Sequence, residues 1–143
     1  MNIITKSEFE TFSLGSEFAK KLKIGDCVIL SGELGSGKTI FVKGLAIGLN
    51  IDKIITSPTF TIIKEYTFKE KYFLYHIDLY RITDDTNRWN LLDIDNYLFP
   101  ENGITVIEWG ENLINKLKSD YYHITIRILD GNIRSIIITS LRD

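Results

Sequence analysis

A glycine-rich segment at residues 32–39, Gly-Glu-Leu-Gly-Ser-Gly-Lys-Thr, constrains the fold of this chain more than any other feature. It fits Gly-x-x-x-x-Gly-Lys-Ser/Thr, the pattern of a phosphate-binding loop between a strand and a helix. The apolar run at residues 27–30 precedes it and is typical of a strand buried on both faces. The segment after it predicts a helix at about residues 38–49, closed by Gly48 or Asn50. The sequence therefore predicts a strand–loop–helix unit of an α/β protein.

The residue types in this loop suit the binding of phosphate. The glycines allow backbone angles at which successive N–H groups converge on phosphate oxygens, and the helix start adds further free N–H groups. Lys38 is expected to reach the β- and γ-phosphates, and the Thr39 hydroxyl to ligate Mg²⁺. We therefore expect a nucleoside triphosphate with magnesium, bound by Glu33, Leu34, Gly35, Ser36, Gly37, Lys38, Thr39 and Ile40.

Two acidic residues stand where a magnesium–nucleotide site needs carboxylates, at the ends of predicted strands. Asp78 ends the run at residues 73–78, and Glu108 ends the run at residues 104–108. The second run is more apolar and predicts a central strand. We expect both acids to take catalytic and metal-binding roles. Which of them ligates magnesium, and which positions an attacking water, stays open at this point.

Other candidates have a functional and a structural interpretation. Ser57 and Thr59 flank a proline where many nucleotide-binding proteins sense the γ-phosphate, but the same residue types form ordinary turns. Trp109 is suited to stack on a base, although an aromatic residue at a strand end more often packs. His76 lies within a predicted strand and is as readily a structural histidine as a functional one.

The rest of the chain alternates strands and helices. A Ser-x-x-Glu capping box at Ser7 opens a predicted helix that runs to about Leu22. We expect further strands at residues 3–4, 61–66 and 72–78, helices at 89–97 and 111–118, and a hairpin of residues 121–129 and 133–140. These elements predict one domain over residues 1–143. Its expected fold is a P-loop NTPase-like three-layer sandwich with a mixed, partly parallel sheet and a C-terminal antiparallel hairpin.

Composition narrows the class of protein. The 143 residues carry a net charge of −2, which argues against a generic nucleic-acid coat. No run of about 20 apolar residues predicts a transmembrane helix, and the N-terminus lacks the pattern of a signal peptide. The single cysteine, Cys27, suits a reducing compartment. We therefore expect a cytoplasmic protein with no membrane partner.

Four motifs in order carry a resemblance to a known family. The loop at residues 32–39 is followed by Ser-Pro-Thr-Phe at 57–60, His-Ile-Asp-Leu-Tyr-Arg at 76–81 and Ile-Glu-Trp at 107–109. Together they resemble the TsaE family of small bacterial P-loop ATPases. Members of this family are required for the threonylcarbamoyladenosine modification beside the anticodon of tRNAs. The resemblance implies that the protein binds the TsaB–TsaD complex and hydrolyses ATP to reset or regulate it, with tRNA as an indirect partner through that complex.

The resemblance also implies roles for individual residues. Lys38 and Thr39 match the phosphate and magnesium residues of the family, and Asp78 matches its Walker B-like acid. Ser57 and Thr59 match a switch-like segment, and Glu108 with Trp109 matches a Glu-Trp element near the nucleotide. The sequence departs from the family at Ile40, where a second threonine is frequent.

Three other functions are alternatives to an ATPase acting on a partner complex. A small-molecule kinase usually needs several lid arginines, and only Arg81 and Arg88 lie between the loop and the hairpin. Another alternative is a non-catalytic module in which ATP merely locks a partner-binding surface. A GTPase is disfavoured, because the run at residues 115–118, Asn-Lys-Leu-Lys, lacks the acid of the guanine-reading Asn-Lys-x-Asp.

Overall fold

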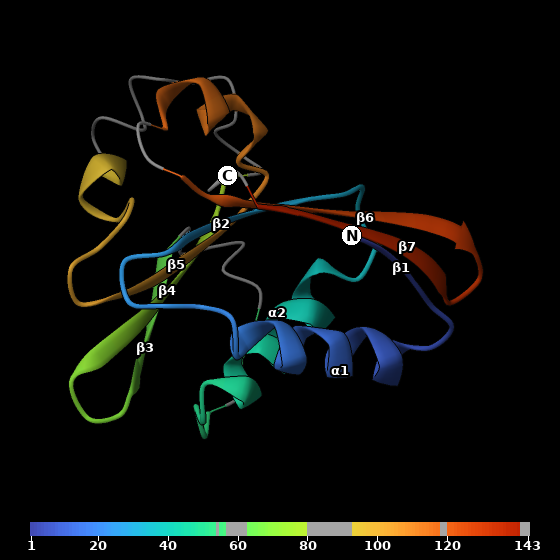
Figure 1. Cartoon of the computed structure of the whole chain (residues 1–143), viewed down its shortest axis with the longest axis horizontal. Helices are drawn as coiled ribbons and strands as arrows, with labels where there is room; N and C mark the ends of the chain where they lie inside the picture. The colour runs from blue at the N-terminus through green and yellow to red at the C-terminus, as the bar shows by residue number, and fades with distance from the viewer. Residues whose placement is uncertain (54, 57–62, 80–92, 118–119, 141–143) are drawn as a thin grey trace.

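The structure is a computed structural model that describes residues 1–53, 55–56, 63–79, 93–117 and 120–140. Its described strands form one seven-stranded sheet in the order β1-β7-β6-β2-β5-β4-β3 (Figure 1). The strands are β1 Asn2–Thr5, β2 Cys27–Ser31, β3 Ile63–Phe68, β4 Tyr72–Asp78, β5 Gly103–Glu108, β6 Tyr122–Asp130 and β7 Ile133–Ser140. The helices are α1 Glu8–Ala19 and α2 Lys38–Gly48, with the short 3₁₀ helices η1 Ile94–Asn96 and η2 Glu111–Lys116.

The sheet is mixed, as the sequence predicts. Strands β6, β2, β5 and β4 are parallel neighbours, while β3, β7 and β1 each pair antiparallel with the strand beside them. The carboxyl ends of β2, β5 and β4 therefore meet at one edge of the sheet. In open α/β sheets, ligands bind outside that edge. The phosphate loop and both candidate acids follow from these strand ends.

The molecule has three layers, with one apolar core on each face of the central sheet. Helices α1 and α2 lie together on one face, below the sheet in Figure 1, and bury Phe18, Phe41 and Leu45 against it. On the opposite face, Ile94 of η1 and Leu113 of η2 pack against the sheet residues. The third layer of the sandwich, within the described residues, is thus built from short 3₁₀ helices. None of the helices found in the described ranges has the length and apolar character that crossing a bilayer requires.

The helix starts are as predicted, and so is the end of α2, where Asn50 has a φ of 62° just after the C-cap Leu49. The end of α1 differs. The Ser7 hydroxyl accepts a hydrogen bond from the Glu10 N–H at 3.1 Å, and the Glu10 carboxylate accepts from the Lys6 N–H at 2.9 Å. Helix α1 ends at Ala19, three residues before the predicted end. The N–H groups of residues 20–22 bond three residues back, so the chain tightens into 3₁₀ geometry there.

Other predicted elements shift or lie outside the described residues. The predicted helix at residues 111–118 is the 3₁₀ helix η2, and part of the predicted helix at 89–97 is η1. Residues 89–92 lie outside the described residues, as do residues 61–62 of the strand that the structure begins at Ile63.

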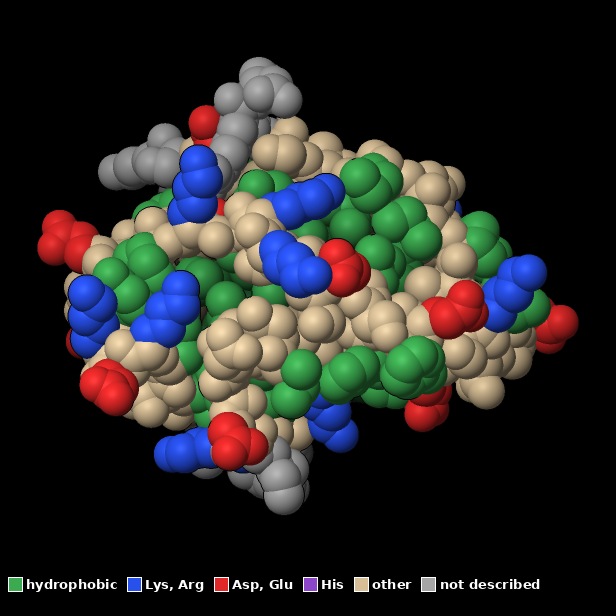
Figure 2. Space-filling view, turned by 60° about the horizontal axis from the view of Figure 1, so that its bottom comes forward, with side chains coloured by type: hydrophobic (Ala, Val, Ile, Leu, Met, Phe, Trp, Pro, Cys, Tyr) green, Lys and Arg blue, Asp and Glu red, His purple; other side chains and the backbone are tan. Residues whose placement is uncertain are grey.

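Glycines allow α1 and α2 to touch through their backbones. A Cβ atom placed on Gly44 would lie 1.9 Å from the carbonyl oxygen of Phe12, and one on Gly15 would lie 2.2 Å from that of Phe41. The outer surface of this helix pair mixes basic, acidic and apolar side chains, as Figure 2 shows. Phe9 and Ile47 are among its exposed apolar residues.

The close helix contact gives a stability prediction for Gly44→Ala. Alanine favours a helix interior over glycine by about 1 kcal/mol, but overpacking a tight contact typically costs about 1–3 kcal/mol or more. Because the clash is with backbone, we expect the free energy of unfolding to fall by about 2 kcal/mol and Tm by about 6 °C. Thermal denaturation followed by circular dichroism measures this, with the exposed Lys43→Ala on the same helix as control. A Tm equal to or above that of the wild type would contradict the contact.

Candidate functional site

The glycine loop spans residues 32–37, between the end of β2 and the start of α2. Gly35 and Gly37 have φ angles of 77° and 109°, which side-chain-bearing residues rarely adopt. A Cβ atom on Gly32 would lie 2.5 Å from the Ser36 Oγ and 2.7 Å from the Ile126 carbonyl oxygen. The N-cap of α2 is Gly37, and no side chain caps this end. The first N–H groups of α2 therefore remain without a side-chain acceptor, which suits an anion.

Lys38, the first residue of α2, folds back over the loop. Its side chain is buried, and Nζ donates hydrogen bonds to the carbonyl oxygens of Gly32 and Glu33. Nζ also lies 4.0 Å from the centroid of the Trp109 ring, a cation–π contact. Burial lowers the pKa of Lys38, and nearby carboxylates oppose this shift, Glu108 most strongly. The loop therefore encloses the buried Lys38 side chain, whose Nζ atom contacts loop carbonyl oxygens.

Asp78 and Glu108 lie beside one another at the ends of β4 and β5. They are partners in the parallel register, and Glu108 is in turn the register partner of Leu30 on β2. Leu30 belongs to the core beneath α1 and α2, so both carboxylates project on the face where α2 begins. Both are buried, with 6% and 3% of their surface exposed. Each also raises the pKa of Lys38, which places them within electrostatic reach of its ammonium group.

His76 holds Glu108 in place from the neighbouring strand. It is fully buried, and its Nε2 atom lies 2.5 Å from Oε2 of Glu108. His76 stands two residues before Asp78, and so on the same face of β4. A buried carboxylate needs such a partner, because desolvation of an unpaired charge is costly. The structure thus gives His76 a contact with a candidate site residue.

The structure brings together most of the residues that the sequence marks as candidates. Lys38, Trp109, Asp78 and Glu108 surround the start of α2, while Thr39 follows Lys38 within that helix. Glu33 and Leu34 are exposed on the loop. Ser57 and Thr59 lie outside the described residues.

Arg134, which no sequence pattern marks as a candidate, contacts the loop from the β6–β7 hairpin. Its Nε donates to the carbonyl oxygen of Ser36 at 2.7 Å, and a terminal nitrogen donates to that of Gly35 at 3.3 Å. Arg134 is 98 residues from Ser36 in sequence. Only the pairing of β6 with β2 and of β7 with β6 brings it there. A lone arginine after a hairpin turn carries no signal that sequence reasoning could have used.

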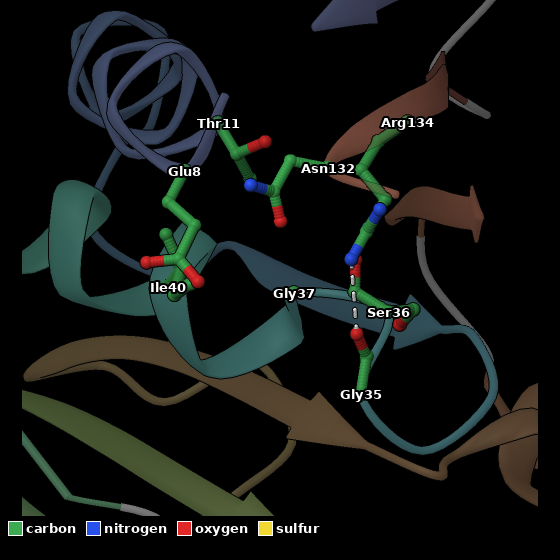
Figure 3. A pocket seen from close by; sticks show the side chains of 8 residues that line it. All are labelled: Glu8, Thr11, Gly35, Ser36, Gly37, Ile40, Asn132 and Arg134. Carbon is green, nitrogen blue, oxygen red and sulfur yellow. Dashed lines mark hydrogen bonds between the residues drawn. The ribbon is translucent and has the colours of Figure 1, made fainter. Parts of the chain in front are cut away.

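A hollow lies beside the loop, between α1 and the β6–β7 hairpin (Figure 3). Its floor is formed by loop residues and Ile40, and α1 contributes Glu8 and Thr11 to its wall. Asn132 and Arg134 close it from the β6–β7 hairpin, with Asn132 and Thr11 pointing toward one another in Figure 3. Because β6 and β5 flank β2 on opposite sides, hollow and acids flank the loop on opposite sides. The hollow therefore opens directly beside the phosphate loop, between α1 and the β6–β7 hairpin.

The chemistry of the donor set fits magnesium. Thr39, Asp78 and Glu108 offer a hydroxyl and two carboxylates, the hard oxygen ligands that Mg²⁺ prefers. In the described part of the chain, no group of three or more His, Cys, Asp or Glu side chains could hold a metal ion by itself. Magnesium at nucleotide sites is usually held by one or two carboxylates together with the phosphates, so this arrangement fits.

The central strands of the sheet are parallel, and β2 at the centre leads through the glycine loop into α2. This architecture defines a P-loop NTPase-like fold. Comparison with known families narrows the class. The model of the family "Threonylcarbamoyl adenosine biosynthesis protein TsaE" matches residues 5–136. The chain therefore belongs to the TsaE family, whose members take part in threonylcarbamoyladenosine biosynthesis on tRNA.

Individual relatives agree with this assignment. The chain is 39% identical to the tRNA threonylcarbamoyladenosine biosynthesis protein TsaE of Bacillus subtilis, over 92% of this chain and 80% of that protein. It is 38% identical to the TsaE protein of Treponema pallidum, over 92% of this chain and 96% of that protein. A crystal structure of Bacillus subtilis YdiB superposes with a TM-score of 0.81 at 34% identity, covering 99% of this chain and 85% of that one. Fold and family membership thus agree along almost the whole chain.

Proposed function

We propose that this protein is a cytoplasmic ATPase of threonylcarbamoyladenosine biosynthesis that hydrolyses ATP to reset or regulate a TsaB–TsaD complex acting on tRNA. The observation that carries the proposal is the meeting of Lys38, Asp78 and Glu108 at one end of the glycine loop. A cation and two buried carboxylates at a helix start are the groups that phosphoryl transfer to water uses. Family membership supplies the pathway, and TsaB, TsaD and tRNA are expected as its other components.

Each residue of the proposed nucleotide site has a role that follows from its position. The loop N–H groups and the start of α2 bind the phosphates, and Lys38 exchanges its carbonyl contacts for phosphate oxygens. Thr39 with one or both acids would hold Mg²⁺, which neutralises phosphate charge when bound. Glu108, fixed by His76, is suited to orient a water molecule toward the γ-phosphate. Catalysis here is positioning and electrostatic stabilisation.

The two sides of the loop suggest where the rest of the nucleotide lies. The hollow lined by Glu8, Thr11 and Asn132 adjoins the loop away from the acids, which favours this side of the loop as the direction in which the ribose and base extend. Trp109 lies on the other side, with its ring against Lys38. This favours a role for Trp109 at the phosphate end, where its ring shields the lysine from water.

Measuring phosphate release from ATP, with and without purified TsaB and TsaD, tests the proposal. We expect weak hydrolysis by the protein alone and a clear rise when both partners are present, with magnesium required in each case. Unstimulated hydrolysis, with normal partner release in a non-hydrolysable ATP analogue, would favour an ATP-gated binding module instead. Phosphate transfer to a nucleoside or sugar that is faster than transfer to water would favour a kinase.

A further inference from the structure

We propose that Arg134 is a positioning residue for the nucleotide site, which holds the phosphate loop in its binding shape by gripping the carbonyl groups of Gly35 and Ser36. The inference rests on the proposed nucleotide binding and assigns a role to a residue of the C-terminal hairpin. Arg134 is half-buried at the start of β7, and its guanidinium group points onto the loop (Figure 3).

The guanidinium group joins two turns of the chain. Nε donates to Ser36 O at 2.7 Å and one terminal nitrogen to Gly35 O at 3.3 Å. The other terminal nitrogen donates to the carbonyl oxygens of Gly131 and Ile133, within its own hairpin. One side chain therefore ties the phosphate loop to the β6–β7 turn. The planar fork of donors makes arginine suited to this, while lysine is a single point charge.

The hydrogen bonds from Arg134 to the loop carbonyls also fix the directions of the neighbouring N–H groups. In a trans peptide the carbonyl oxygen of one residue and the N–H of the next point in opposite directions. Holding the Ser36 carbonyl toward Arg134 therefore directs the Gly37 N–H to the opposite side of the chain. The Gly35–Ser36 peptide is fixed at both ends, because the Ser36 N–H donates to Glu33 O at 3.1 Å.

The loop needs such a tether because of its composition. Gly32, Gly35 and Gly37 give the unliganded loop more conformational freedom than other residues would, and that freedom is lost when phosphate binds. Lys38 holds the first half of the loop through the carbonyls of Gly32 and Glu33. Arg134 holds the second half. Ordering the loop before binding lowers the entropic cost of binding.

The test compares Arg134→Gln and Arg134→Lys with Arg127→Gln, an exposed arginine on the same hairpin. The dissociation constant of Mg–ATP, the Tm, and amide hydrogen exchange at residues 35–37 in nucleotide-free protein are measured for each. We expect Arg134→Gln to weaken ATP binding by about 10-fold to 100-fold and to speed exchange at residues 35–37, while Tm changes little. Arg134→Lys should restore only part of the affinity, and Arg127→Gln should match the wild type.

Three outcomes would overturn the inference. Affinity and local exchange in Arg134→Gln could equal those of Arg127→Gln, or Arg134→Lys could bind ATP as tightly as the wild type. Faster exchange spread over the whole chain, with a Tm loss that accounts for the weaker binding, would indicate a structural role alone. If the wild type binds no Mg–ATP but exchange at residues 35–37 still rises in Arg134→Gln, the ordering of the loop by Arg134 is supported and the proposed function fails.

Discussion

Replacing Lys38 with alanine is expected to lower the rate of ATP hydrolysis by about 10²-fold to 10³-fold, the effect of removing one preorganised charge-stabilising donor. Lys38 is the buried cation of the loop, and its ammonium group lies within electrostatic reach of both acids. Without it, charge that develops on the γ-phosphate meets two buried carboxylates, and the other lysine of α2, Lys43, is exposed to solvent. Single-turnover hydrolysis at saturating Mg–ATP measures this loss separately from any change in affinity.

Lys43→Ala is the matched control for this variant. Lys43 lies on the same helix but is exposed to solvent, so its removal should leave hydrolysis and Tm close to those of the wild type. Lys38→Ala also frees the Gly32 and Glu33 carbonyls, and Tm therefore needs to be measured alongside activity. Robust hydrolysis by folded Lys38→Ala would remove Lys38 from the proposed mechanism.

Local patterns predicted the part of the site that is continuous in sequence. The glycine spacing, the buried run before it and the helix after it are short-range signals, and the structure has all three elements in that order. The apolar run before Glu108 indicated a central strand, and β5 indeed lies between β2 and β4. Parallel strands then bring the two acids together, because their carboxyl ends share one edge.

Local sequence patterns could not predict which residues far apart in the chain contact one another. Arg134 reaches the loop only through the register of β7 on β6 and of β6 on β2, which no local pattern encodes. The contact of His76 with Glu108 likewise depends on β4 pairing with β5. The end of α1 was misplaced because a switch to 3₁₀ hydrogen bonding leaves the apolar pattern unchanged.

The two acids, whose division of roles the residue patterns alone left open, have different surroundings in the structure. Glu108 has the larger effect on the Lys38 pKa and is held by His76, whereas Asp78 has the smaller effect. A carboxylate that is fixed by a neighbour and close to the loop cation is the better placed to orient a water molecule. Asp78, one strand farther from the loop, is then suited to a supporting role in binding magnesium.

This difference predicts unequal effects of Glu108→Gln and Asp78→Asn, each of which removes a charge with little change in shape. We expect Glu108→Gln to lower single-turnover hydrolysis by about 10²-fold to 10³-fold while Mg–ATP affinity changes by less than about 10-fold. Asp78→Asn should lower hydrolysis less and raise the magnesium concentration needed for half-maximal activity. The exposed Glu101→Gln, in the turn before β5, serves as control and should behave as wild type. A larger hydrolysis defect in Asp78→Asn than in Glu108→Gln would reverse the two roles, because the residue that orients water must dominate the chemical step.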